Sequence, residues 1–322
     1  MREILRTSDA FHISWLIALL ADYRIDAVLF DEHTSVLEGS ANAIPRRLMV
    51  IDEDYDAAMR LMVQIGKLED KNISTVTELY DQPNHLLNGR VILHQPRGGY
   101  RSAIDPVFLA AAVPDAQNTR ILDVGCGFGS GALCYAARVS SANVVGIELQ
   151  PQLSLLAEYN IAANGFGERM QVMTGDLLNP PPELRPESFD EVMANPPYLR
   201  ADQADPSPEV TKAVSTIEGA ADLACWVKFC VTMARPLGGI TFIHRADRLD
   251  ELLALLYEHL GRIVVFPLWS FAGQPAKRVI VHGRRGAKSP MRLSAGMVLH
   301  TESNNFTCAA ESVLRDGMAL RL

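Results

Sequence analysis

The chain has 322 residues, of which 48% are hydrophobic and 21% charged, and its formal net charge is −8. This length allows two domains or one enlarged domain, and the composition is ordinary for a globular protein. There is no run of about 18 uncharged apolar residues, and the first six residues lack the apolar core of a signal peptide. The sequence therefore predicts a cytoplasmic protein without a membrane span, with five reduced cysteines and no metal site.

Charge is unevenly distributed along the chain. Residues 1–70 contain 13 Asp and Glu against 7 Lys and Arg, whereas Arg262–Arg292 contains seven basic residues and no acidic one. The overall negative charge argues against a general nucleic-acid binder. The basic stretch can either follow phosphates or form a solvated edge of the protein.

The first 66 residues predict a small independent α+β domain with the order β-α-β-β-α. Its strands are expected at 4–6, 25–30 and 47–51, and its helices at 9–23 and 52–66. The Asp31-Glu32-His33 segment, Gly39-Ser40 and the Ile44–Leu48 segment resemble a small bacterial domain that is described as signal-transducing. The role of residues 1–66 stays open, and a protein partner or regulator is one candidate for what they contact.

A polar stretch at residues 67–87 predicts a linker, and a second domain is expected at residues 88–322. This domain begins with a strand at 90–94, followed by a helix at 105–113. Asp105 and Pro106 are the residue types expected at the N-cap and first turn of that helix.

From residue 120 onward, short apolar strands alternate with helices. This rhythm predicts an α/β fold, with a doubly wound, Rossmann-like, mostly parallel sheet of seven strands. No helix separates the last two strands, so they should form a hairpin with the last strand antiparallel. The strands are expected at 120–124, 143–147, 170–173, 191–194, 240–244, 263–266 and 278–282, and the helices at 129–139, 151–163, 220–234 and 249–260. A small hairpin over 297–308 and a final helix should follow.

A glycine-rich turn directly follows the first of these strands. Asp123 precedes Gly125, Gly127 and Gly129, and glycine lets the backbone bend sharply where a ligand approaches. A dinucleotide fingerprint would require glycine at position 130, where Ser130 stands, and there is no Lys-Ser/Thr pair for a nucleoside triphosphate.

This pattern resembles the cofactor motif of class I S-adenosylmethionine-dependent methyltransferases. The resemblance implies that S-adenosylmethionine is the cofactor and that Asp123 organises its methionine end. Glu148 would then accept the ribose hydroxyls and Asp176 would bind the adenine amino group. The implied cofactor-binding set is Asp123, Gly125, Cys126, Gly127, Gly129, Glu148, Leu149, Asp176, Leu177 and Asn195.

A second motif, Asn195-Pro196-Pro197-Tyr198, ends a later strand. An exocyclic amine on adenine, or a carboxamide nitrogen, is a poor nucleophile because its lone pair is delocalised. The Asn195 carboxamide oxygen and the Pro196 carbonyl can hold the N–H bonds and direct the lone pair toward the methyl group. The two prolines stiffen that carbonyl, and the Tyr198 ring offers a flipped base a surface for stacking. The motif is shared by amino-N methyltransferases that act on nucleic-acid adenine and by those that act on protein glutamine.

The flanking segments resemble the bacterial tRNA1(Val) adenine-N6 methyltransferase family over residues 88–322. The matching residues include Gln95-Pro96, Ile104-Asp105-Pro106 and Pro275-Ala276-Lys277-Arg278. The resemblance implies methylation of adenine N6 in tRNA or other structured RNA. The RNA contacts would come from Tyr100, Arg101, Lys277, Arg278, Arg284 and Arg285.

Three features depart from that family pattern: the acidic N-terminal domain, the negative net charge and the acidic loop at 199–218. They leave open N5-methylation of a protein glutamine. They also leave open a non-catalytic protein that uses the methyltransferase fold to sense a ligand or partner.

Overall fold

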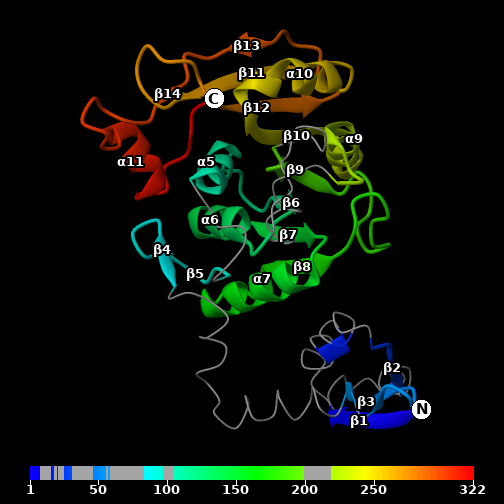
Figure 1. Cartoon of the computed structure of the whole chain (residues 1–322). Coiled ribbons are helices and arrows are strands. Elements are labelled where there is room, and N and C mark those ends of the chain that lie inside the picture. The colour runs from blue at the N-terminus through cyan, green and yellow to red at the C-terminus, as the bar shows by residue number, and fades with distance from the viewer. Residues whose placement is uncertain are drawn as a thin grey trace. The chain divides into compact units, whose positions relative to one another are not determined.

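The computed structural model describes residues 1–7, 16–17, 20, 25–30, 46–55, 57–58, 83–96, 104–198 and 219–322. The chain divides into two compact units, Met1–Leu79 and Tyr80–Leu322 (Figure 1). Strand β4 (Asn84–Leu86) lies inside the stretch predicted as a linker. The domain boundaries drawn from the sequence remain predictions.

The first unit contains an antiparallel sheet of three strands, β1 (Arg2–Thr7), β2 (Ala27–Phe30) and β3 (Arg46–Val50). Strand β3 lies between the other two. The fully buried side chains of Leu16, Leu20 and Leu48 pack together on one side of the sheet. All three strands lie where the sequence predicts them, whereas most of the two predicted helices falls outside the described residues.

The second unit is built on a nine-stranded sheet with the order β13-β11-β12-β10-β9-β6-β7-β8, and β14 also pairs with β11. Strands β6 to β10 run parallel to one another, and β12 runs antiparallel to both β10 and β11. This confirms the doubly wound, mostly parallel sheet and its antiparallel last strand. Two short strands, β13 (Arg292–Leu293) and β14 (Met297–Val298), join the sheet beyond the seven predicted. Those seven are β6 (Arg120–Val124), β7 (Asn143–Glu148), β8 (Met170–Thr174), β9 (Phe189–Ala194), β10 (Ala234–Arg245), β11 (Leu260–Trp269) and β12 (Arg278–Arg285).

Helices cover both faces of this sheet (Figure 1). Alternation along β6 places Ile121 in the core on one face, and Leu122 and Val124 in the core on the other. One face packs against α5 (Asp105–Ala112), α6 (Ser130–Arg138), α7 (Pro151–Ala163) and α11 (Cys308–Leu314), and the other against α9 (Leu223–Met233) and α10 (Leu249–Tyr257).

The start of α5 corrects one prediction. Its N-cap residue is Ile104, which makes no side-chain capping bond, and Asp105 is already inside the first turn. The Asp105 carboxylate therefore does not cap the helix and is available for contacts outside it.

A two-stranded hairpin, β4 with β5 (Val91–Leu93), is attached to helix α7 by two asparagines. The Asn164 carboxamide accepts from the backbone N–H of Ile92 at 2.8 Å and donates to its carbonyl at 2.7 Å. The Asn160 carboxamide does the same with His94, at 2.8 and 3.0 Å. Asn160 is fully buried and also donates to the carbonyl of Phe128, in the glycine-rich turn, at 3.0 Å.

Candidate active site

A cavity of about 220 Å³ lies at the carboxyl ends of strands β6, β7, β8 and β9. Ligands bind at this edge in open parallel sheets because the loops there converge where the strand order reverses. The predicted cofactor and acceptor residues that line it are Asp123, Gly125, Cys126, Gly127, Glu148, Leu149, Asp176, Leu177, Asn195, Pro196, Pro197 and Tyr198. Gly129 is not among the lining residues; it is the N-cap of α6 and has a φ of 87°.

The glycine-rich turn is tied to strand β7 by its backbone. The N–H groups of Gly125 and Cys126 both donate to the carbonyl of Ile147, at 2.8 and 3.1 Å. Gly125 has a φ of 67°, and a Cβ atom added there would lie 2.4 Å from the indole of Trp226. The sequence predicted that glycine makes room for a ligand. At Gly125 the neighbour that requires glycine is a tryptophan from α9, which the sequence analysis had missed.

Glu148 shapes the turn as well as lining the cavity. One carboxylate oxygen accepts from the N–H of Gly127 at 2.9 Å, and the other accepts from the N–H of Gln150 at 2.8 Å. Burial raises the pKa of Glu148, and these backbone hydrogen bonds partly offset that rise. Each carboxylate oxygen has further lone pairs, so Glu148 can still accept hydroxyl groups from the cavity.

Asp123 is nearly buried, and its Oδ2 accepts from the N–H of Ala132, in the first turn of α6, at 3.1 Å. Burial raises the pKa of Asp123 to about 7, the Ala132 hydrogen bond lowers it, and the charge of Glu148 raises it again. Near neutral pH a large fraction of the carboxyl groups is therefore protonated. A positively charged ligand in the cavity would favour the ionised form.

Apolar side chains complete the lining near the ends of β7 and β8. Leu149 and Leu178 line the cavity and are 55% and 45% exposed, which is high for leucine. Asp176 Oδ1 accepts from the N–H of Leu178 at 2.9 Å and so holds this turn. Exposed leucines beside carboxylates fit a ligand that has a flat heteroaromatic ring, hydroxyl groups and a positive charge. S-adenosylmethionine has all three.

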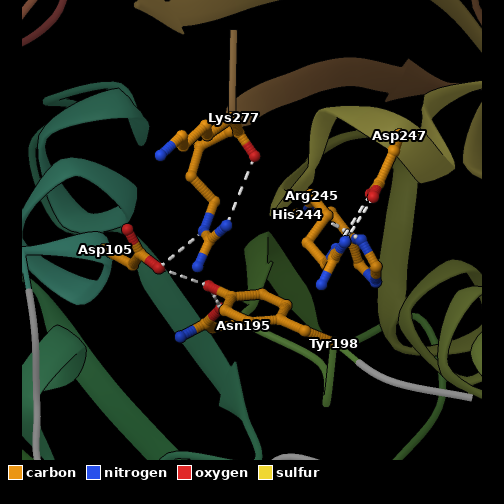
Figure 2. A network of polar contacts seen from close by, with 8 residues as sticks. Asp105, Asn195, Tyr198, His244, Arg245, Asp247 and Lys277 are labelled. Atoms are coloured by element: carbon orange, nitrogen blue, oxygen red, sulfur yellow. Dashed lines mark hydrogen bonds and ion pairs between the residues drawn. The ribbon is translucent and has the colours of Figure 1, made fainter. Parts of the chain in front are cut away.

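The Asn-Pro-Pro-Tyr motif continues from β9 and is part of a polar network (Figure 2). The Tyr198 hydroxyl oxygen lies 2.6 Å from Asn195 Oδ1 and 2.6 Å from Asp105 Oδ2. Arg278 Nε donates to the same Asp105 oxygen at 2.9 Å, and its guanidinium carbon lies 4.3 Å from the centroid of the Tyr198 ring. Asp105, which the sequence analysis assigned to a helix cap, thus joins the acceptor motif to β12.

His244 is a further residue of this region that the sequence analysis did not assign. It is fully buried near the end of β10, and its ring meets the Tyr198 ring edge-on, with centroids 5.6 Å apart. Its Nδ1 accepts from the N–H of Arg245 at 2.8 Å. Burial, followed by the charge of Arg248, lowers the pKa of His244 to about 4, so the imidazole is neutral at physiological pH. No local motif marks this histidine, because only the sheet order brings it to Tyr198.

The residues predicted to contact RNA do not form one group. Tyr100 and Arg101 lie outside the described residues, as does the loop at 199–218. Lys277 and Arg278 lie at the start of β12, whereas Arg284 and Arg285 lie roughly 20 Å along the same strand. There Arg284 pairs with Glu191 at 3.1 Å and Arg285 pairs with Glu187 at 2.7 Å. These carboxylates offset both charges at the end of the strand opposite the cavity.

The described residues contain no helix with the length and hydrophobicity that a membrane span requires. Nor do they contain a group of three or more His, Cys, Asp or Glu side chains that could hold a metal ion.

Comparison with known families identifies two regions of the chain. Residues 1–66 match the family model described as "Putative prokaryotic signal transducing protein". Residues 103–221 match the family model described as "Methyltransferase small domain".

Several curated relatives carry the name tRNA1(Val) (adenine(37)-N6)-methyltransferase. The protein from Aeromonas salmonicida is 27% identical over 184 residues, which are 56% of this chain and 75% of that protein. The one from Porphyromonas gingivalis is 32% identical over 51% of this chain and 65% of that protein. The one from Dickeya chrysanthemi is 25% identical over 66% of this chain and 85% of that protein.

Among solved structures, a protein from Agrobacterium tumefaciens described as "a predicted O-methyltransferase" aligns with a TM-score of 0.56 at 22% identity. The alignment covers 67% of this chain and 98% of that protein, and it shows a shared fold. Residues 103–221 therefore match a methyltransferase small domain, and the second unit shares its fold with a solved structure described as a methyltransferase.

Proposed function

We propose that this protein transfers the methyl group of S-adenosylmethionine to an exocyclic amino nitrogen, and that the acceptor is adenine N6 in tRNA. The observation that carries the proposal is that the glycine-rich turn and Asn195 line one cavity. A methyl donor held by the turn and an amine held by Asn195 would therefore meet there. The names of the curated relatives support tRNA as the acceptor.

On the cofactor side, each residue has a separate role in the proposal. Glu148 accepts hydrogen bonds from the ribose hydroxyls, and Asp176 accepts one from the adenine amino group. Leu149 and Leu177 flank the adenine ring. Asp123 provides negative charge near the methionine end. When bound, the cofactor supplies an electrophilic methyl group on a positively charged sulfur.

On the acceptor side, the chain contributes mainly position. Asn195 Oδ1 and the Pro196 carbonyl accept hydrogen bonds from the two N–H groups of the amine. The lone pair of the amine nitrogen then points into the cavity. Pro196 and Pro197 have fixed φ angles, which keep that carbonyl in place. Holding the reactants in this geometry removes a large entropic part of the barrier.

The surface charges support a limited RNA interface at the described residues. Lys277 is exposed at the cavity end of β12 and can reach a phosphate, whereas Arg284 and Arg285 are paired with acids. A tRNA substrate also implies a cytoplasmic location. Residues 1–66 remain our candidate for contacting a protein partner or regulator.

The proposal is tested by incubating the protein with methyl-labelled S-adenosylmethionine and separate fractions of tRNA, ribosomal RNA and total protein. We expect label in tRNA, as N6-methyladenine after digestion. Asn195→Ala should abolish this transfer while calorimetry still detects cofactor binding. Label in the protein fraction alone would favour the glutamine alternative, and label in no fraction would favour a non-catalytic protein. Loss of cofactor binding in Asn195→Ala would contradict the role given to this residue.

A further inference from the structure

The Tyr198 hydroxyl has one proton and two neighbouring acceptors. Its oxygen lies 2.6 Å from Asp105 Oδ2 and 2.6 Å from Asn195 Oδ1. A phenol hydroxyl donates one hydrogen bond at a time. Whichever acceptor lacks the proton must therefore be satisfied in another way.

Asp105 is the stronger of the two acceptors. A hydrogen bond to a carboxylate is stronger than one to a neutral carboxamide. Asp105 is only 8% exposed, and Arg278 Nε holds the same oxygen at 2.9 Å. Arg278 also lies against the face of the Tyr198 ring, 4.3 Å from its centroid. The carboxylate, the arginine and the tyrosine ring are thus held together by contacts between α5, β12 and the end of β9.

If Tyr198 donates to Asp105, its oxygen can act only as an acceptor toward Asn195. The Asn195 carboxamide matches this arrangement when its Nδ2–H, rather than its oxygen, faces Tyr198. In Figure 2 the nitrogen of Asn195 points away from the Tyr198 hydroxyl. A half-turn of the carboxamide would exchange the two atoms. It would turn the oxygen away from Tyr198, and Asn195 is one of the residues that line the cavity.

We propose that Asp105 and Arg278 are positioning residues, which hold the Tyr198 hydroxyl so that the Asn195 carboxamide presents its oxygen to the acceptor amine. The proposal rests on the amino-methyl transfer proposed above. It assigns two orientations to Asn195. One has its oxygen held by Tyr198 and is unproductive, and the other has its nitrogen held by Tyr198 and is productive. Asp105 selects the productive orientation by accepting the hydrogen bond that the Tyr198 hydroxyl donates.

The test compares Asp105→Ala, Tyr198→Phe and the double variant in single-turnover and steady-state methylation of tRNA. Without Asp105, the Tyr198 hydroxyl should donate to Asn195 Oδ1, so kcat should fall by about tenfold, the value of one hydrogen bond, with little change in KM. Tyr198→Phe removes the competing donor and should reduce kcat by only about threefold. The double variant should be faster than Asp105→Ala and close to Tyr198→Phe.

A merely structural role for Asp105 gives the opposite pattern, because the double variant would then be no faster than Asp105→Ala. That result would overturn the proposal. Asp115→Ala is the matched control, since it removes another aspartate near α5, one whose ion pair with Arg138 measures 2.8 Å. It should leave kcat unchanged. Melting temperatures and cofactor affinity are measured for every variant to exclude unfolding.

A second measurement does not depend on methyl transfer. In protein bound to S-adenosylmethionine and labelled at asparagine with nitrogen-15, the Asn195 side-chain N–H that bonds to Tyr198 should exchange slowly with solvent. Both Tyr198→Phe and Asp105→Ala should accelerate this exchange. Unchanged exchange in both variants would reject the proposed orientation of Asn195. Slow exchange in a wild-type protein that methylates no tRNA would instead reject the proposed function and retain the orientation.

Discussion

Gly125 and Gly127 form a matched pair for testing the packing of the glycine-rich turn. Both have left-handed φ angles, 67° and 57°. A Cβ atom added at Gly125 would lie 2.4 Å from Trp226 Cη2 and 3.0 Å from Cζ3, whereas one added at Gly127 would meet no atom within 4 Å. Alanine at the two positions therefore shares the backbone penalty and differs in the contact with Trp226.

The expected free energies follow from these two terms. A left-handed residue other than glycine costs roughly 1–2 kcal/mol, which applies to both variants. Forcing an extra carbon into a packed core costs about 1–3 kcal/mol more, and this applies to Gly125→Ala alone. Trp226 is 8% exposed and packed in the core, so its ring cannot move aside freely. We expect Gly127→Ala to lose about 1–2 kcal/mol and Gly125→Ala about 2–5 kcal/mol.

Urea unfolding without cofactor measures both losses and avoids any effect on ligand binding. Adding Trp226→Phe, which shortens the ring at this contact, should make Gly125→Ala cost less than it does beside tryptophan. The same change should have no such effect on Gly127→Ala. Equal losses for the two alanine variants, or no relief from Trp226→Phe, would refute the assignment of Trp226 as the reason for glycine at 125.

Two other predictions concern charge. The pKa of Asp123 is about 7 in the folded protein, above its ordinary value of 3.8, so the folded state binds more protons than the unfolded state between these pH values. The free energy of unfolding should therefore fall as pH rises from about 4 to about 7, and Asp123→Asn should flatten this dependence in urea titrations; an unchanged slope would contradict the buried carboxyl. In tRNA binding, Lys277→Ala should reduce the slope of log affinity against log salt by about one unit, while Arg284→Ala should leave it unchanged because Glu191 already pairs with that guanidinium. A similar reduction for Arg284→Ala would show that both ends of β12 contact phosphate, and an unchanged slope for Lys277→Ala would exclude Lys277 from the RNA interface.

Local patterns in the sequence were sufficient to predict most strands and helices of the second unit. Helix α7 was predicted with its observed ends, because Pro151 begins it and Asn164-Gly165 follows its last residue. The strand at 120–124 was also predicted with its observed ends. In both cases the neighbouring residues define the element, so no knowledge of distant contacts was needed.

The site was predicted less completely, because part of it depends on contacts between distant segments. Asp105 looks like a cap in the sequence, yet it contacts Tyr198 and Arg278, which are 93 and 173 residues away. Arg278 looked like a phosphate contact because a basic stretch of sequence does not reveal which of its charges are already paired with distant acids. His244 and Trp226 stand in ordinary apolar segments, and only the sheet order brings them to the motif residues.

The attachment of strand β5 to helix α7 has a consequence for aggregation of the protein. A strand with one free edge offers its N–H and C=O groups to any other extended chain, and so invites aggregation. Asn160 and Asn164, one helical turn apart, present the donor and acceptor pairs that a neighbouring strand would present to Ile92 and His94. The helix thus occupies the place of a further strand. The asparagines thus prevent this edge of the hairpin from pairing with another chain. They do so without adding a β-strand that would itself have an unpaired edge.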